Sequence, residues 1–206
     1  MSLKWLPNAL TVSRCVLAIV VGYSILSIDL DIRNGRASGV WLFLPFVLFT
    51  VTAASDWLDG ALARALDAQS EFGSRLDPIA DKLLTASCLI ALCHSERWAL
   101  YIALPSLTIV GRDFLLTAMR EALGNPSGLK VSSMAKWKTA IALSAIGCVL
   151  FSMALSQHAN DAERFSPVWL LTRGPLMAGL AGIWFAAILS VVTAWDYVAA
   201  AGRADE

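Results

Sequence analysis

Four aspartates lie in two closely spaced pairs, and this spacing is the feature of the sequence best suited to chemistry. Asp56 and Asp59 are three residues apart, and Asp77 and Asp81 are four apart. Residues at these spacings lie on one face of an α-helix. The loop predicted between the pairs, residues 65–76, would let two helices lie side by side. We therefore expect the carboxylates to converge.

Converging carboxylates need compensation, because like charges raise each other's pKa and charge near lipid is costly. Divalent cations would provide it, and all-oxygen ligands suit Mg²⁺ or Mn²⁺. Two such ions, about 4 Å apart, can clamp a phosphate group. A single aspartate of this kind is more often a helix cap or a solvated helix end. The complete set favours a metal site, and Arg64, on the same face as Asp56, would hold a phosphate.

Six apolar segments would position these residues at a membrane. Hydrophobic residues make up 57% of the chain, which is more than soluble domains contain, and a helix needs about 20 residues to cross the hydrocarbon core. The predicted spans are 9–28, 37–55, 78–94, 98–119, 139–157 and 175–195. Pro78 suits the first turn of the third span. We therefore expect an all-α integral membrane protein, with one transmembrane catalytic domain over residues 1–206.

Positive charge predicts the orientation of the spans. With the N-terminus inside, eleven of the sixteen Lys and Arg residues lie on the inner side, which favours a cytoplasmic N-terminus and a cytoplasmic site. Tryptophans mark most span ends, although Trp57 and Trp184 do not. The net charge is zero, so a nucleic-acid partner has no electrostatic support.

Small residues recur at helical spacing around span six. They are Gly174, Ala178, Ala181 and Gly182. Such residues permit close helix packing in membranes, but they are also common as apolar filler, and both interpretations stay open.

The aspartates belong to a longer pattern that resembles the signature of the CDP-alcohol phosphatidyltransferase family. That signature is D-x2-D-G-x2-A-R-x8-G-x3-D-x3-D. With every spacing kept, it is filled here by Asp56, Asp59, Gly60, Ala63, Arg64, Gly73, Asp77 and Asp81. Members of the family are six-helix membrane proteins, which agrees with the spans predicted above.

The resemblance implies a reaction and a role for each residue. CDP-diacylglycerol would bind at the cytoplasmic face, and an alcohol would attack its β-phosphorus and displace CMP. The resemblance implies two Mg²⁺ or Mn²⁺ ions on Asp56, Asp59, Asp77 and Asp81, with Asp81 also the catalytic general base. The CDP portion would contact Asn8, Thr11, Gly60, Arg64, Ser70 and Gly73. The resemblance also implies a homodimer in a bacterial inner membrane.

A set of basic residues resembles the members of that family whose acceptor is glycerol 3-phosphate. The residues that would bind the acceptor phosphate are Arg112, Arg120, Lys136 and Lys138. Arg112 lies inside an apolar span, where charge usually has a function, and Asp113 would be its partner. The alternative is that these residues follow the positive-inside rule and bind no ligand.

Two other functions remain open. The sequence Gly111-Arg112-Asp113 also resembles cardiolipin-synthase-type members, whose acceptor is phosphatidylglycerol, whereas many members that use glycerol 3-phosphate have Ala-Arg-Glu. A function of another class, a cation transporter with the aspartates as its ion site, would favour acidic residues near the middle of the bilayer. Here they lie at span ends.

Overall fold

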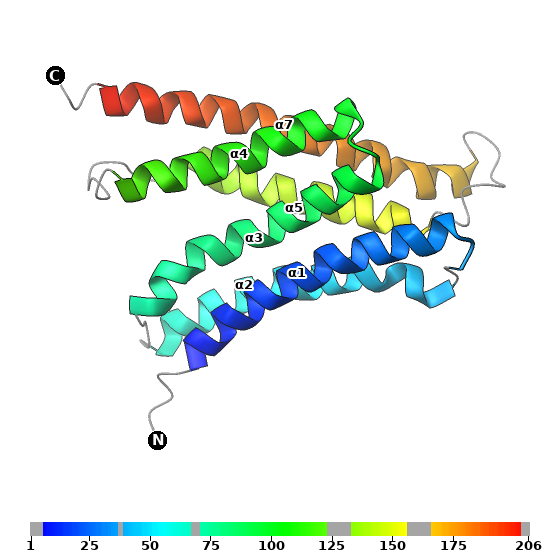
Figure 1. The fold of residues 1–206 in the computed structure, drawn as a ribbon, viewed down its shortest axis with the longest axis horizontal. Helices are drawn as coiled ribbons and strands as arrows, with labels where there is room; N and C mark the ends of the chain where they lie inside the picture. Colours follow the sequence, from blue (N-terminus) through cyan, green and yellow to red (C-terminus); the bar gives the residue numbers. More distant parts are fainter. Residues whose placement is uncertain (1–5, 37–38, 67–70, 123–132, 156–165, 203–206) are drawn as a thin grey trace.

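The protein is a bundle of long helices. A computed structural model describes residues 6–36, 39–66, 71–122, 133–155 and 166–202. Within these residues the secondary structure is helical throughout. The elements are α1 (Leu6–Arg33), η2 (Gly39–Phe43), α2 (Leu44–Leu66), α3 (Glu71–Ser95), α4 (Leu100–Ala122), α5 (Ser133–Ala154) and α7 (Pro167–Gly202). The helices alternate in direction along an elongated bundle, and α1 begins at the end where α7 finishes (Figure 1). The all-α prediction is confirmed.

Apolar stretches identify the bundle as a multi-pass membrane protein. Among the described residues, four helices carry a stretch long and apolar enough to cross a membrane. These stretches are Val12–Arg33, Leu100–Met119, Trp137–Ala154 and Pro167–Trp195. Shorter apolar stretches among the described residues lie at Gly39–Ser55, in η2 and α2, and at Lys82–Ser95, in α3. In lipid every backbone polar group must be satisfied internally, which a helix achieves by itself.

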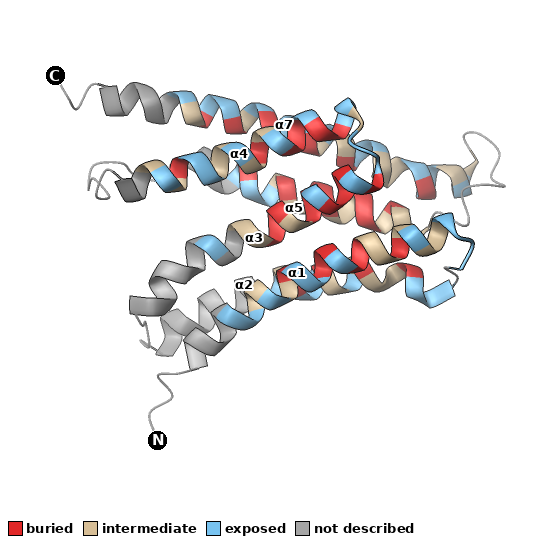
Figure 2. Ribbon diagram, in the orientation of Figure 1, coloured by how far each residue is buried: buried red, intermediate tan, exposed pale blue. Residues whose placement is uncertain are grey.

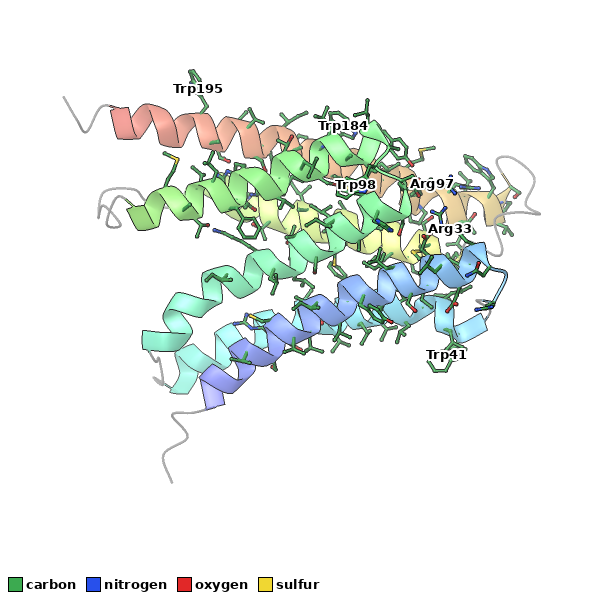
Figure 3. All side chains as sticks on the ribbon, in the orientation of Figure 1. Arg33, Trp41, Arg97, Trp98, Trp184 and Trp195 are labelled. Carbon is green, nitrogen blue, oxygen red and sulfur yellow. The ribbon has the colours of Figure 1, made fainter. Side chains whose placement is uncertain are left out.

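The outer surface of the bundle matches a lipid environment. Large apolar side chains are widely exposed there, including Leu100 at 79% and Met177 at 61%, whereas monomeric soluble proteins rarely expose large apolar patches. Figure 2 shows the buried residues on the inward faces and the exposed ones on the outward faces. Exposed tryptophans lie near the bundle ends, with Trp41 and Trp98 towards one end and Trp195 towards the other (Figure 3).

Four helices begin earlier than hydropathy predicts. α1 starts at Leu6, α3 at Glu71, α5 at Ser133 and α7 at Pro167. The loop predicted over residues 65–76 is therefore wrong in part, since α2 continues to Leu66 and α3 begins at Glu71. The expectation that Pro78 lies in the first turn of its helix is therefore wrong, and Asp77 and Asp81 lie well inside α3. Hydropathy detects only the part of a helix that must be apolar, so it misses polar turns that continue beyond the hydrocarbon core.

The helices pack around a continuous apolar core, with α1 closest to α3 and α5 closest to α7. Fully buried side chains come from every long helix. They include Ile25, Pro45, Leu89, Ile109, Ile146 and Ile183. Each of the long helices therefore contributes to the core.

Two glycines bring α7 against α5. A Cβ atom on Gly179 would lie 2.6 Å from Val149 Cγ2 and 2.7 Å from the Ala145 carbonyl oxygen. A Cβ atom on Gly182 would lie 2.8 Å from the Ala145 Cβ. Both residues must therefore be glycine for the helices to approach this closely. The close-packing prediction is confirmed for Gly182, but open space or exposure makes it wrong for Gly174, Ala178 and Ala181.

The end of the bundle opposite the paired aspartates is held by a polar contact. Arg33, at the end of α1, forms an ion pair with Asp29 at an Nε–Oδ2 distance of 2.8 Å. Its guanidinium also donates to the Ser95 carbonyl at the end of α3. Because α1 and α3 are parallel neighbours, this contact lies a full helix length from Asp77.

Candidate functional site

The paired aspartates lie on two helix ends that the chain joins directly. Asp56 and Asp59 belong to the last turns of α2, which ends at Leu66, and Asp77 and Asp81 belong to α3, which begins at Glu71. Only four residues separate the two helices, so their ends must be close. The four side chains lie outside the described residues, and their convergence stays a prediction.

The predicted CDP contacts come from the same end of the bundle. Asn8 and Thr11 lie near the start of α1, Gly60 and Arg64 near the end of α2, and Gly73 in the first turn of α3. Figure 1 shows these three helix ends together. Ser70 and the side chains of the other residues lie outside the described part of the structure. The placement on helix ends agrees with a shared site, and the contacts stay predictions.

The described part of the site is a buried polar cluster on one carboxylate, Asp113 of α4. Its Oδ1 accepts from Arg112 Nη1 at 3.0 Å and from Lys138 Nζ of α5. Its backbone carbonyl accepts from Thr117 Oγ1 at 2.7 Å and from Lys82 Nζ of α3 at 3.3 Å. Lys82 also donates to Thr117 Oγ1. We call these five residues the basic cluster.

Arg112 extends the contacts of the basic cluster to α7. Its Nη2 donates to Thr193 Oγ1 at 2.8 Å, and the Thr193 hydroxyl donates to the Leu189 carbonyl at 2.8 Å. The guanidinium is thus held by Asp113 at one terminal nitrogen and by Thr193 at the other. The polar contacts therefore join four helices in the middle of an apolar bundle: α3, α4, α5 and α7.

The basic cluster is positively charged and poorly accessible to water. Within it, the cations Arg112 and Lys138 share one anion, Asp113, and Lys82 donates to the Asp113 carbonyl. The exposed fraction of the side chain is 4% for Lys138, 16% for Asp113 and 18% for Arg112. Buried charge of one sign is costly unless an ion of the other sign approaches. The cluster is suited to binding an anion.

One buried hydrogen-bond donor of the basic cluster lacks a partner among the described residues. Arg112 Nε is buried and has no hydrogen-bond partner among the described residues. A buried N–H without a partner is unfavourable, and a guanidinium presents its donors in a fixed fork that matches phosphate. The orphaned donor therefore marks a point where a ligand oxygen would gain a charge-assisted hydrogen bond.

The basic cluster adjoins the predicted metal site through the chain itself. Lys82 directly follows Asp81 on α3, so their Cα atoms are about 3.8 Å apart. A search of the described residues finds no group of three or more acidic, His or Cys side chains, but the paired aspartates lie outside that search. The metal site therefore rests on placement and donor chemistry.

Binding of the acceptor phosphate by the basic residues stays a prediction, although the structure places some of them. The structure brings Arg112 and Lys138 together, and the predicted pairing of Arg112 with Asp113 is confirmed. Arg120 lies at the end of α4 and Lys136 near the start of α5, but their side chains are outside the described residues.

Sequence reasoning missed three residues of this site: Lys82, Thr117 and Thr193. Lys82 could have been found from its position directly after Asp81. Thr117 lies one helical turn after Asp113, which is a weak signal. Nothing in the sequence marks Thr193, because its partner Arg112 lies 81 residues away.

Comparisons with known proteins match most of the chain. A sequence profile described as CDP-alcohol phosphatidyltransferase matches residues 4–195. A CDP-diacylglycerol–glycerol-3-phosphate 3-phosphatidyltransferase of Cereibacter sphaeroides is 32% identical over 218 residues, which cover 95% of each chain. A protein of the same name from Escherichia coli is 32% identical over 170 residues, or 79% of this chain and 80% of that one. A cardiolipin synthase (CMP-forming) of Oryza sativa subsp. japonica is 32% identical over 194 residues, or 87% of this chain and 54% of that one.

Proposed function

Because the chain belongs to the CDP-alcohol phosphatidyltransferase family, we propose that it transfers a phosphatidyl group from CDP-diacylglycerol to glycerol 3-phosphate. The products are CMP and phosphatidylglycerophosphate, which makes the protein a phosphatidylglycerophosphate synthase of phospholipid biosynthesis. The observation that carries the choice of acceptor is the basic cluster, in which Arg112 and Lys138 converge from two helices on Asp113, an arrangement suited to a phosphate monoester.

The reaction exchanges one phosphorus–oxygen bond for another. The acceptor hydroxyl oxygen bonds to the β-phosphorus of CDP-diacylglycerol, and the bond from that phosphorus to the CMP oxygen breaks. Asp81 takes the hydroxyl proton as the general base. Asn8, Thr11, Gly60, Arg64, Ser70 and Gly73 hold the CDP portion. A base in α3 beside Lys82 would place the proton acceptor next to the cations that bind the acceptor phosphate.

The residues present fit a pair of Mg²⁺ or Mn²⁺ ions. Asp56, Asp59, Asp77 and Asp81 form an all-oxygen donor set on adjoining helix ends, which is the chemistry these ions prefer. When bound, the ions would neutralise charge on the transferred phosphate group. We assign these aspartates as the metal ligands.

The basic cluster accounts for binding of the acceptor. Arg112 and Lys138 are desolvated cations that converge on Asp113. The Arg112 Nε–H group has no hydrogen-bond partner among the described residues. Arg120 and Lys136, near the same ends of α4 and α5, would complete the phosphate site. An anion that enters the cluster would reduce its net positive charge, so binding is favoured by the burial that makes the empty cluster costly.

The second candidate is transfer to phosphatidylglycerol, which the similarity to the cardiolipin synthase favours. Phosphatidylglycerol carries one negative charge, so it would leave more of the charge of the cluster uncompensated. The family match supports the transferase and gives no support to the cation transporter.

The proposed setting is a bacterial inner membrane, with the site facing the cytoplasm and the protein a homodimer. The excess of Lys and Arg on the side of the site supports this orientation, and the Escherichia coli relative supports the bacterial setting. The apolar core shared by the described helices supports the proposal of a single domain over residues 1–206.

A CMP-release assay tests the function. Purified protein in detergent with CDP-diacylglycerol and Mg²⁺ is offered glycerol 3-phosphate, phosphatidylglycerol, serine or inositol phosphate. We expect fast CMP release with glycerol 3-phosphate alone among the four. Faster release with phosphatidylglycerol would support the second candidate, and no release with any acceptor would contradict the reaction itself.

A further inference from the structure

The basic cluster presents an unusual arrangement of its cations. Two of them, Arg112 and Lys138, contact the same carboxylate atom, Asp113 Oδ1. They come from different helices, and both are largely shielded from water. Two cations do not stay together in such an environment without an anion between them. The carboxylate of Asp113 is therefore what allows them to converge in the empty protein.

The orientation of Arg112 depends on two anchors. Adjacent residues on a helix point in different directions, so Arg112 must turn along α4 to reach Asp113. Its other terminal nitrogen is held by Thr193 at 2.8 Å. With Nη1 and Nη2 both engaged, the plane of the guanidinium is fixed, and Nε is presented without a partner among the described residues.

We propose that Asp113 and Thr193 are positioning residues for the acceptor: together they fix the guanidinium of Arg112, and Asp113 also holds Lys138, in the arrangement that binds the phosphate of the acceptor alcohol. This inference rests on the proposed function. The two residues act through Arg112 and Lys138 and need no contact with the substrate.

The arrangement implies a specific kinetic signature. The CDP portion is assigned to residues of α1, α2 and α3, whereas Asp113 and Thr193 lie on α4 and α7. Loss of either residue should therefore raise the KM for the acceptor and leave the KM for CDP-diacylglycerol unchanged. A residue that only stabilises the fold would change both substrates together, or would lower the amount of folded enzyme without changing either KM.

The test compares Asp113→Asn with Asp113→Glu and a control. Asparagine keeps the shape of the side chain and removes its charge, whereas glutamate keeps the charge. Asp29→Asn is the matched control, because Asp29 pairs with Arg33 at 2.8 Å at the other end of the bundle. Each full-length variant is assayed in detergent by CMP release, with glycerol 3-phosphate and CDP-diacylglycerol varied in turn.

We expect Asp113→Asn to raise the KM for glycerol 3-phosphate by about tenfold or more, as for the loss of interactions between charged groups. The KM for CDP-diacylglycerol should change less than about twofold. In Asp113→Glu the KM for glycerol 3-phosphate should return most of the way to the wild-type value. In Asp29→Asn both KM values should equal those of the wild type. Equal rises in both KM values, or an unchanged KM for glycerol 3-phosphate, would overturn the proposal.

Thr193→Val provides a second test if Asp113→Asn does not fold. It removes one neutral anchor of the guanidinium without changing any charge, and we expect a rise of about threefold in the KM for glycerol 3-phosphate alone, as for one modest hydrogen bond. An unchanged KM in this variant would overturn the role of Thr193 and the two-anchor arrangement. Failure of the proposed function is distinct, because the wild type itself would then release no CMP with glycerol 3-phosphate.

Discussion

Substitution of Gly179 by alanine should destabilise the bundle, although alanine is the better helix former. The exchange would gain about 0.5–1 kcal/mol from helix propensity. The new Cβ would lie 2.6 Å from Val149 Cγ2, 2.7 Å from the Ala145 carbonyl oxygen and 3.1 Å from the Val149 backbone nitrogen. Two of these atoms belong to the backbone and cannot rotate away. The α5–α7 interface must therefore open.

The magnitude follows from the difference between these effects. Overpacking a tight contact costs about 1–3 kcal/mol, and the backbone contacts place Gly179 at the upper end of that range. After the propensity gain is subtracted, the free energy of unfolding should fall by about 2 kcal/mol. For a chain of this size that corresponds to a decrease of about 4–8 °C in Tm.

Gly174→Ala is the matched control, because it makes the same exchange in the same helix. A Cβ there would have nothing within 4 Å apart from its chain neighbours. Because residue 174 precedes Pro175, where a side chain disfavours the helical conformation, the propensity gain is offset in part and Tm should change by less than about 2 °C. Thermal unfolding of the variants in one detergent, followed by circular dichroism, measures the difference. A Gly179→Ala protein that melts at or above the wild type would refute the packing argument, as would an equal loss at Gly174.

Four further predictions concern the site. Asp81→Asn should abolish CMP release while CDP-diacylglycerol still binds, and full activity in that variant would refute its role as base. Removal of divalent ions by a chelator should stop turnover, and Mg²⁺ or Mn²⁺ should restore it, whereas activity that survives chelation would contradict the metal assignment. Arg112→Lys keeps the charge but cannot engage Asp113 and Thr193 together, so kcat/KM for glycerol 3-phosphate should fall by about tenfold or more. Lys138→Met should raise the KM for glycerol 3-phosphate without lowering Tm, because Asp113 keeps Arg112 as its partner; an unchanged KM would show that Lys138 does not bind the acceptor.

The paired aspartates illustrate what the sequence can predict. Metal ligands on helices must recur at helical spacing, so Asp56 with Asp59 and Asp77 with Asp81 are visible as a pattern, and they lie on adjoining ends of α2 and α3. The apolar spans are visible for a similar reason, because lipid demands about 20 uninterrupted apolar residues. Constraints between residues that are close in sequence can therefore be recognised as sequence patterns.

Contacts between segments that are distant in sequence produce no such pattern. Gly179 and Gly174 lie in the same apolar stretch, yet one meets Ala145 and the other meets open space. The rotation of α7 decides which glycine is needed, and that rotation depends on packing over the whole interface. The role of Thr193 cannot be recognised from the sequence either. A threonine in an apolar helix normally donates its hydroxyl hydrogen bond to a preceding backbone carbonyl. Only the fold shows that Thr193 also holds Arg112.

The basic cluster also shows why function and stability are opposed in this bundle. An apolar core of the same volume would be cheaper than two largely buried cations on one carboxylate, and Arg112 Nε, which has no partner among the described residues, adds to that cost. The cluster is held in place by residues with no other evident role, such as Thr117, which supports Lys82 and the Asp113 carbonyl. Preorganised charge of this kind is unfavourable until an anion arrives, and the same burial then strengthens the attraction. The electrostatic cost of holding these cations together would therefore add to the affinity for an anionic acceptor.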